Sequence, residues 1–470
     1  MGVTEQLAGF AIDTPSGFLT PLLAASAKSK FLDTLAVMIA GSHSPAGRIA
    51  RTTALESGGI PESTIVGHAD KTSMALAGFV NGVSAHALEY DDLTLVVGHA
   101  SVCLVPACLA VAERLNLSGK QMVEAFAIGF EVAARVGKGL QPYILDRGWH
   151  PTGIIGAQGV AAASARMLEL DAMATRMAMG IAASSAGGVR KNIGSMGKAF
   201  HIGHGVRSGI FAATMASHGF KVDPDVIERG DAGANQGYGL ADAFNGPGNY
   251  RMDQMVDHLG QDLELSRNTT LVRMHPGSTP PAAAIDGIID LALAHNISAV
   301  DVEYMQVECH PRMLAIASYP QPTDPYRAKF CLPYTFAVAF VDRKVGVAQY
   351  AEERIRDPGV LDFMRRVQVN VRGDQLRQVG HGEGNSVDWG EVQLTVRLKD
   401  GRVLTSRCRQ ARGWPDTPAS WEDLCGKFED CAENIFPKSQ IKESIAMIAN
   451  LSDLASVRDL TKLLMVPSPS

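Results

Sequence analysis

The feature that most constrains how this chain folds is a series of helical segments whose apolar residues cover more than one face. Segments 28–40 and 120–136 both place large apolar residues at helical spacing. Segment 154–168 is so rich in Ala and Gly that its helix must pack with its backbone close to its neighbours. Such helices cannot all lie on a surface, so the pattern predicts a core of several helical layers.

The pattern changes after about Leu265, where alternation of apolar and polar residues predicts β-strands. Residues 300–309 and 366–372 alternate in this way. The clearest strand signal is 390–408, in which Asp400-Gly401 supplies the turn of a β-hairpin. This part of the chain is therefore predicted to be α+β. Helices are expected around these strands, at 282–294, near 336–342 and at 421–465.

The length of 470 residues exceeds what one hydrophobic core usually holds, so two domains are expected. The predicted fold class is mainly α. A large all-helical domain would combine residues 1–265 with the C-terminal helices 411–470 and so be discontinuous. A smaller α+β lid domain would occupy residues 266–410.

Composition excludes several classes of partner. The net charge of −6 and the pI near 6.1 argue against binding to nucleic acid, which needs a strongly basic face. No apolar run is long enough to span a membrane, and the N-terminus does not resemble a signal peptide. Seven scattered cysteines, an odd number, favour a reducing compartment over a disulfide framework, so we expect a cytoplasmic protein.

The segment 187–209 carries the strongest functional signal. It combines Lys, Arg and His residues with glycines and contains no carboxylate, which lets backbone and ammonium groups approach an anion closely. Lys198 in this segment could pair with a substrate carboxylate or, if desolvated, act as a base. The alternative is a surface loop that leads into a helix, with a solvated Lys198. No metal site is predicted, because His201 and His204 lack a third ligand at sensible spacing.

Two glycine-flanked histidines lie upstream of this segment. His99 follows an acidic stretch that includes Asp91 and Asp92, an arrangement suited to orienting an imidazole or donating a proton. His150 directly precedes Pro151 at an expected helix start, and a helix N-terminus favours an anion and lowers the pKa of a nearby histidine. Either histidine alone is more often structural. Together with Lys198 they suggest one site for a small, negatively charged molecule.

Several sequence blocks, taken in order, resemble the MmgE/PrpD family, which includes 2-methylcitrate dehydratase, cis-aconitate decarboxylase and iminodisuccinate epimerase. The resemblance implies a helical domain with an α+β lid, a homodimer, and an active site between the domains that needs no cofactor. It also implies a small di- or tricarboxylate substrate that reacts at a carbon next to a carboxylate. The blocks include FLDTLAVMIAG, GFVNGVSAHALEYDD, WHPTGIIGAQGVAAASARMLEL, GKAFHIGHGVRSG and PYRAKFCLPYTFAVAF.

By this resemblance His99, His150 and Lys198 fall on active-site positions, with Asp92 in the acidic motif beside them. Tyr143 or Asp92 would assist the histidine that exchanges the α-proton. Further substrate contacts are expected from side chains later in the chain. Arginine is suited to this role because it binds a carboxylate with two parallel hydrogen bonds. The alternative for the arginines is a salt bridge on the surface. These candidate contacts are His275, Arg312 and Arg327.

The sequence departs from the family pattern at three positions. Glu89 and Leu93 replace the Asp and Thr of the acidic motif, and Ala282 stands where dehydratases and decarboxylases carry a histidine. Either His275 substitutes for that histidine or the chemistry differs. The predicted function is a lyase of the dehydratase type. The alternatives are an epimerase that transfers a proton between two bases, and a non-catalytic protein that kept the fold.

Overall fold

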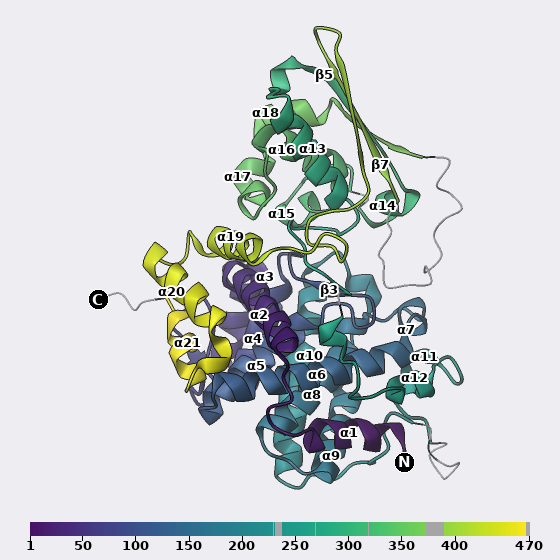
Figure 1. Ribbon diagram of the computed structural model, residues 1–470, viewed down its shortest axis with the longest axis vertical. Coiled ribbons are helices and arrows are strands. Elements are labelled where there is room, and N and C mark those ends of the chain that lie inside the picture. Colours follow the sequence, from purple (N-terminus) through teal and green to yellow (C-terminus); the bar gives the residue numbers. More distant parts are fainter. Residues whose placement is uncertain (229, 231–236, 268, 318, 373–389, 467–470) are drawn as a thin grey trace. The chain divides into compact units, whose positions relative to one another are not determined.

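The computed structural model describes the chain except residues 229, 231–236, 268, 318, 373–389 and 467–470 (Figure 1). The chain forms two compact units. Unit 1 comprises Met1–Ala87, Asp91–Thr270 and Leu424–Ser470, and unit 2 comprises Leu88–Tyr90 and Leu271–Asp423. Unit 2 therefore ends later than the predicted lid. It also includes Leu88 and the first two residues of the acidic motif, Glu89 and Tyr90, which the sequence placed in the helical domain.

Unit 1 is built from helices, with one short hairpin of β1 (Ser63–Thr64) and β2 (Lys71–Thr72). The C-terminal helices belong to this unit except for the first turn of α19, so the helical unit is discontinuous. Its helices are α1 (Val3–Asp13), α2 (Pro21–Ser42), α3 (Pro45–Glu56), α4 (Met74–His86), α5 (Ser101–Leu115), α6 (Gly119–Leu140), α7 (Tyr143–Asp146), α8 (Pro151–Met167), α9 (Ala172–Ser185), α10 (Met196–Ser217), α11 (Leu240–Asn245), α12 (Met252–Val256), α19 (Trp421–Ala432), α20 (Lys438–Ala449) and α21 (Val457–Leu463).

Glycines let the central helices of unit 1 approach each other closely. Helix α8 packs against α6 and α10, and α10 also packs against α4. A Cβ added at Gly159 of α8 would lie 2.5 Å from the carbonyl oxygen of Gly129 in α6. A Cβ at Gly203 of α10 would meet the carbonyl oxygen of Phe79 at the same distance. The predicted close packing of an Ala/Gly-rich helix core is confirmed.

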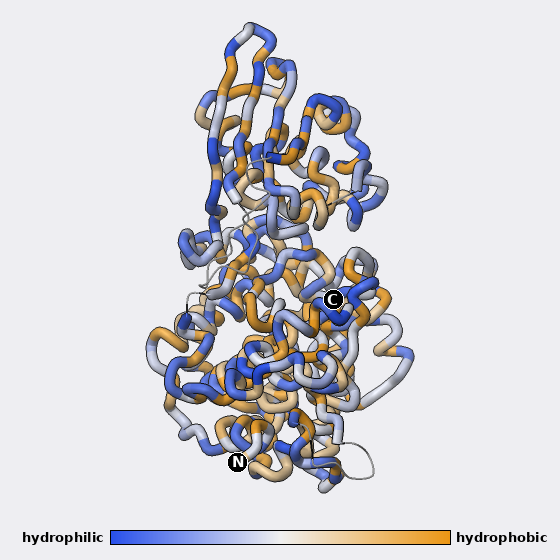
Figure 2. Tube along the Cα trace, turned by 90° about the vertical axis from the view of Figure 1, so that its right-hand side faces the viewer, coloured by the Kyte–Doolittle hydropathy of each residue, from blue (hydrophilic) through white to orange (hydrophobic). Residues whose placement is uncertain are grey.

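Unit 2 contains a four-stranded sheet in the order β6-β5-β7-β8. Strand β5 pairs parallel with β6 and antiparallel with β7, which pairs antiparallel with β8. Polar and apolar residues alternate along these strands (Figure 2), and the predicted hairpin turn is present with Gly401 at φ +91°. The strands are β5 (Val302–Cys309), β6 (Val367–Val371), β7 (Val392–Leu398) and β8 (Val403–Cys408).

Helices cover this sheet and close the hydrophobic core of unit 2, in which α13 and α16 contribute most of the helical residues. The predicted helix 282–294 is confirmed with the same bounds. The mainly α fold class is also confirmed. The helices of unit 2 are α13 (Ala282–Ala294), α14 (Pro311–Ile316), α15 (Pro325–Ala328), α16 (Leu332–Asp342), α17 (Glu352–Ile355) and α18 (Pro358–Met364). Two short strands, β3 (Leu93–Thr94) and β4 (Thr270–Leu271), pair with each other in a separate two-stranded sheet.

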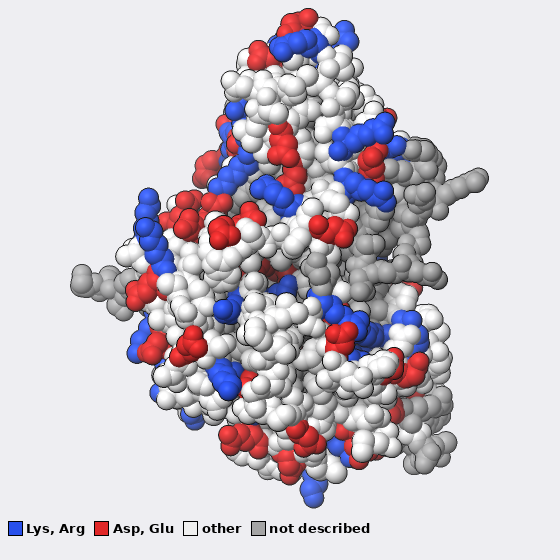
Figure 3. Space-filling view, viewed as in Figure 1, with Lys and Arg blue, Asp and Glu red and all other residues white. Residues whose placement is uncertain are grey.

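Surface properties agree with the composition. Acidic and basic side chains are mixed over the face shown in Figure 3. None of the seven cysteines, all of which are described, forms a disulfide. Among the described residues, no helix is both long and apolar enough to cross a membrane.

Candidate active site

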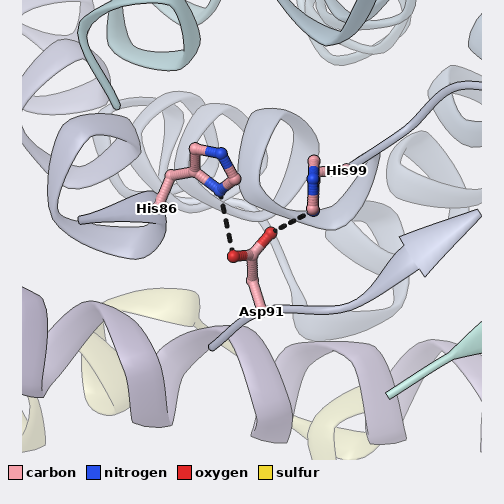
Figure 4. A group of neighbouring side chains, drawn as sticks. All are labelled: His86, Asp91 and His99. Atoms are coloured by element: carbon pink, nitrogen blue, oxygen red, sulfur yellow. Dashed lines mark hydrogen bonds and ion pairs between the residues drawn. The ribbon is translucent and has the colours of Figure 1, made fainter. Parts of the chain in front are cut away.

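The centre of the candidate site is a carboxylate between two imidazoles in unit 1 (Figure 4). His86 is the last residue of α4, and its Nδ1 lies 2.9 Å from Oδ1 of Asp91. His99 stands just before α5, and its Nδ1 lies 2.7 Å from Oδ2 of Asp91. All three residues are buried. One carboxylate therefore orients both rings.

These contacts define which nitrogen of His99 carries the proton. Its Nδ1 also lies 2.8 Å from the backbone carbonyl oxygen of Asp92, so both neighbours of Nδ1 are acceptors. A neutral imidazole donates from only one nitrogen. The neutral ring of His99 therefore holds its proton on Nδ1 and presents an unprotonated Nε2, which is the form that accepts a proton in catalysis.

A second pair of histidines adjoins the first. His150 caps the N-terminus of α8, where Pro151 occupies the first helical position. Its ring stacks on His86 at a centroid distance of 6.2 Å, and its Nδ1 lies 3.2 Å from Nδ1 of His201 in α10. The glycine-rich segment forms the wall beside these rings. Gly188 has φ +144° and accepts a hydrogen bond from the backbone N–H of His150.

Lys198 joins this group from the first turn of α10, which Ser195 caps. Its side chain is only 8% exposed. The ammonium of Lys198 acts electrostatically on both His99 and His150. The structure thus brings together the three residues that the sequence singled out, in one part of unit 1. Their catalytic roles stay predictions.

Burial and neighbouring cations keep these imidazoles neutral. Burial lowers the pKa of His99 to about 4, with Lys198 and His86 acting in the same direction and Asp91 opposing them. Burial also lowers the pKa of His150 well below its usual range, and Lys198 is the next cause. The sequence attributed such a shift to the N-terminus of α8, whereas removal of the ring from water is the larger effect.

The depressed pKa values predict that the protein loses stability in mild acid. A histidine that is neutral in the folded state stabilises it fully above pH 6.5, and this contribution is lost as the pH falls through the folded-state pKa. For His99 the loss amounts to about 3 kcal/mol between pH 6.5 and pH 4. Urea unfolding at several pH values should show a shallower loss in His99→Gln than in the wild type or in the exposed control His258→Gln. An identical pH dependence in all three proteins would contradict the shift.

Two further predicted residues occupy different places. The Asp92 side chain does not contact the imidazoles, since its Oδ2 accepts a hydrogen bond from Ser101 at 2.6 Å and lies 3.5 Å from Nζ of Lys30. Tyr143 begins α7 and is 39% exposed, and no hydrogen bond or ion pair among the described residues links it to the histidines. The sequence analysis missed His86, and it named Asp92 as the candidate where the structure places Asp91 against the imidazoles.

The remaining candidates lie in unit 2. Both ring nitrogens of His275 face acceptors, with Nδ1 3.1 Å from the carbonyl oxygen of Val345 and Nε2 2.9 Å from Oδ1 of Asp286. A role in substrate binding would require one of these bonds to break. Arg327 is exposed, and its Nε lies 3.6 Å from Oδ2 of Asp324. This is the surface salt bridge that the sequence analysis gave as the alternative to a substrate contact. Arg312 belongs to α14, but its side chain lies outside the described residues.

One group of residues has the chemistry of metal ligands. Potential ligand atoms of His86, Asp91 and His99 all lie within 4.8 Å of one another. Their contacts of 2.9 and 2.7 Å are those of imidazole N–H groups on a carboxylate, and these protons would have to leave before a metal could bind. We therefore interpret the group as an oriented imidazole pair. The expectation that the protein needs no cofactor stays a prediction.

Comparison with known proteins links the whole chain to one family. The model of the MmgE/PrpD N-terminal domain matches residues 5–245, and that of the MmgE/PrpD C-terminal domain matches residues 276–453. The cis-aconitate decarboxylase of Homo sapiens is 26% identical over 476 residues, 99% of this chain and 95% of the relative. The cis-aconitate decarboxylase of Mus musculus is 25% identical over 481 residues, 99% and 94% of the two chains. That of Aspergillus terreus is 23% identical over 489 residues, 100% and 97% of the two chains.

Proposed function

The chain belongs to the MmgE/PrpD family, and we propose that it is a lyase that acts on a small di- or tricarboxylate at a carbon α to a carboxylate. The observation that carries this proposal is the group of neutral imidazoles and one ammonium in unit 1. Lys198 supplies the charge that attracts an anion, and His99 and His150 supply bases at neutral pH. The relatives are cis-aconitate decarboxylases, which supports a reaction of the decarboxylase or dehydratase type.

The chemistry follows from where charge develops. Breaking a bond at a carbon α to a carboxylate leaves an electron pair that spreads onto the carboxylate oxygens as an enolate-like anion. A fixed ammonium beside these oxygens lowers the barrier, and Lys198 is proposed for this role. In decarboxylation, carbon dioxide leaves and a protonated imidazole returns a proton to carbon. In dehydration, a neutral imidazole takes the α-proton and the hydroxyl leaves with a proton as water.

Binding of a polycarboxylate substrate is expected to raise the pKa of the imidazoles and so make them stronger bases. Burial holds the pKa of His99 low, and Lys198 and His86 lower it further, although Asp91 opposes them. A bound polycarboxylate brings negative charge beside the rings and raises their pKa, because an anion favours the protonated form. The imidazole thus becomes a stronger base when a substrate is present. We assign the proton-transfer step to His99 or His150 on this ground.

The test is a substrate panel followed by NMR. The full chain should convert cis-aconitate with release of carbon dioxide, or convert a hydroxylated tricarboxylate such as 2-methylcitrate with loss of water. The His99→Gln variant should lose this activity. Its thermal unfolding curve should show that the variant is still folded at the temperature of the assay. Folded protein that converts no member of a broad polycarboxylate panel would contradict the proposal and favour a non-catalytic family member.

Epimerisation remains a second candidate because of one specific residue. Ala282 begins α13. By the family resemblance, dehydratases and decarboxylases carry a histidine at this position. Proton transfer between two faces of a carbon needs two bases and no acid for a leaving group. Two neutral imidazoles fulfil that need. Exchange of the α-proton for solvent deuterium, with no loss of water or carbon dioxide, would favour this reaction.

We further propose that the protein is a homodimer in the cytoplasm and that α10 contributes to the dimer interface. Met196, Phe200 and Phe211 are each at least half exposed and follow one stripe of α10, with Arg207 between them. Apolar side chains exposed along one helix face are typical of protein interfaces. The family resemblance identifies the occupant as a second copy of this chain. The odd number of cysteines supports the cytoplasmic location.

A charge on this stripe should separate the subunits. Phe211→Glu would bury a carboxylate in an apolar interface, so we expect its sedimentation coefficient to fall from that of a dimer to that of a monomer at micromolar concentration. Leu22→Glu is the matched control, because Leu22 is also a large exposed apolar residue but lies on α2. A Phe211→Glu protein that sediments like the wild type would refute an interface on α10.

A further inference from the structure

A second group of buried charges lies in unit 1 next to the histidine site. Nζ of Lys427 in α19 lies 2.6 Å from Oδ1 of Asp33 in α2, and both side chains are completely buried. Fully buried Lys and Asp side chains are rare, and burying them costs free energy unless they are paired. The roles assigned above to the imidazoles and Lys198 do not account for the burial of this ion pair.

Contacts lead from this ion pair to His99. Lys30 precedes Asp33 by three residues on α2, so both side chains lie on the same face of the helix. Nζ of Lys30 lies 3.5 Å from Oδ2 of Asp92, which also accepts a hydrogen bond from Ser101. The backbone carbonyl oxygen of Asp92 accepts the hydrogen bond from Nδ1 of His99. Asp92 therefore joins the buried charges to the catalytic imidazole.

The charges of this group balance. Two ammonium groups, Lys30 and Lys427, face two carboxylates, Asp33 and Asp92. Burial raises the pKa of Asp33, and so does the nearby charge of Asp92, whereas Lys427 and Lys30 lower it. The two ammonium groups offset the cost of burying the two carboxylates. Removing one cation leaves two anions in competition for the other.

We propose that Lys427, Asp33 and Lys30 form a charge-balanced network that positions Asp92, and through it the Nδ1–H of His99. Lys427 pairs with Asp33, so Lys30 is available to pair with the side chain of Asp92. With its side chain held between Lys30 and Ser101, Asp92 keeps its carbonyl oxygen on His99 and fixes the start of the segment that follows Asp91. Helix α19 thereby acts on the site through α2 and Asp92. The catalytic consequence rests on the proposed function of His99.

Loss of Lys427 should disturb this arrangement in a defined way. In Lys427→Met, Asp33 keeps its charge only by drawing Lys30 away from Asp92. Asp92 then loses its ion pair, and the acceptor at Nδ1 of His99 moves. Adding Asp33→Asn removes the competing anion, so Lys30 returns to Asp92. The double variant should therefore recover what the single variant loses.

The experiment uses the full chain labelled with [15N]histidine and needs no substrate. Long-range proton–nitrogen NMR spectra at pH 7 report which ring nitrogen of each histidine is protonated, and His99→Gln assigns the signal of His99. We expect the Nδ1–H form to dominate in the wild type and in Lys438→Met, an exposed control on α20. Lys427→Met should shift His99 to a mixture of the two forms, and Asp33→Asn/Lys427→Met should restore the wild-type spectrum.

Activity provides the second readout. With cis-aconitate as the probe, Lys427→Met should lower kcat about 10-fold with little change in KM, and the double variant should recover it. An unchanged His99 signal in folded Lys427→Met overturns the proposal. A double variant as perturbed as the single one also overturns it, because the role is then one of packing. If Lys427→Met does not fold, Lys30→Met, which removes the other ammonium of the network, is required to give the same shift of His99. Wild-type protein with the expected spectrum but no activity would refute the proposed function alone.

Discussion

Replacing Asp91 with Asn is expected to lower kcat by about 1,000-fold while leaving the fold intact. The carboxylate accepts a hydrogen bond from Nδ1 of His86, and its other oxygen lies 2.7 Å from Nδ1 of His99. An asparagine of the same size offers one acceptor and one donor, so one of the two imidazoles must move its proton to Nε2. A wrong tautomer of a catalytic histidine is costly, as the Asp→Asn change in serine protease triads shows, where the loss is about 10,000-fold.

The control for this experiment is Asp257→Asn, which removes an exposed carboxylate from the same unit. It should retain wild-type activity. The [15N]histidine spectrum of Asp91→Asn should show one of the two rings in the Nε2–H form. If Asp91→Asn keeps its full kcat, or if both rings keep Nδ1–H, then the carboxylate does not orient a catalytic imidazole.

Replacing Lys198 with Met is expected to lower kcat/KM by about 100- to 1,000-fold, the usual cost of removing one group that stabilises charge in the transition state. The same change should raise the pKa of His99 and of His150, because the Lys198 ammonium lowers both. The second effect can be measured by NMR titration of the imidazoles without any substrate. Thermal unfolding at neutral pH should remain within a few degrees of the wild type.

Lys191→Met is the matched control for Lys198, because Lys191 belongs to the same glycine-rich segment but is exposed. It should change neither the activity nor the histidine pKa values. A Lys198→Met enzyme with wild-type kcat/KM would show that the ammonium does not bind or stabilise the reacting anion. Loss of activity without any rise in the histidine pKa values would place Lys198 away from the rings.

Local patterns in the sequence predicted most of the fold. The hairpin at Asp400-Gly401 and helix α13 could be recognised because turn chemistry and helical periodicity are properties of neighbouring residues. The parallel pairing of β5 with β6 could not, because the two strands are far apart in the sequence and only tertiary structure brings them together. The assignment of Leu88–Tyr90 to unit 2 is non-local for the same reason.

The candidate site was predictable to a similar degree. His99, His150 and Lys198 stand in distinctive glycine-flanked motifs, so both their chemistry and the family resemblance pointed to them. Asp91 and Asp92 are adjacent, and which carboxylate meets the imidazoles depends on the direction of the backbone, which Ser101 and Lys30 help to set. His86 gave no signal, since a single histidine at the end of an apolar helix is more often structural.

The most direct test of the account follows the reacting carbon in deuterated water. The full chain is incubated with cis-aconitate, and NMR records deuterium at the carbon α to a carboxylate together with the release of carbon dioxide. We predict that the wild type converts cis-aconitate or a related polycarboxylate to a lyase product, and that Lys198→Met and His99→Gln form almost none. Equal product from all three proteins, or unchanged cis-aconitate and related polycarboxylates with folded wild type, would contradict the claim that this ammonium and these imidazoles act on a polycarboxylate.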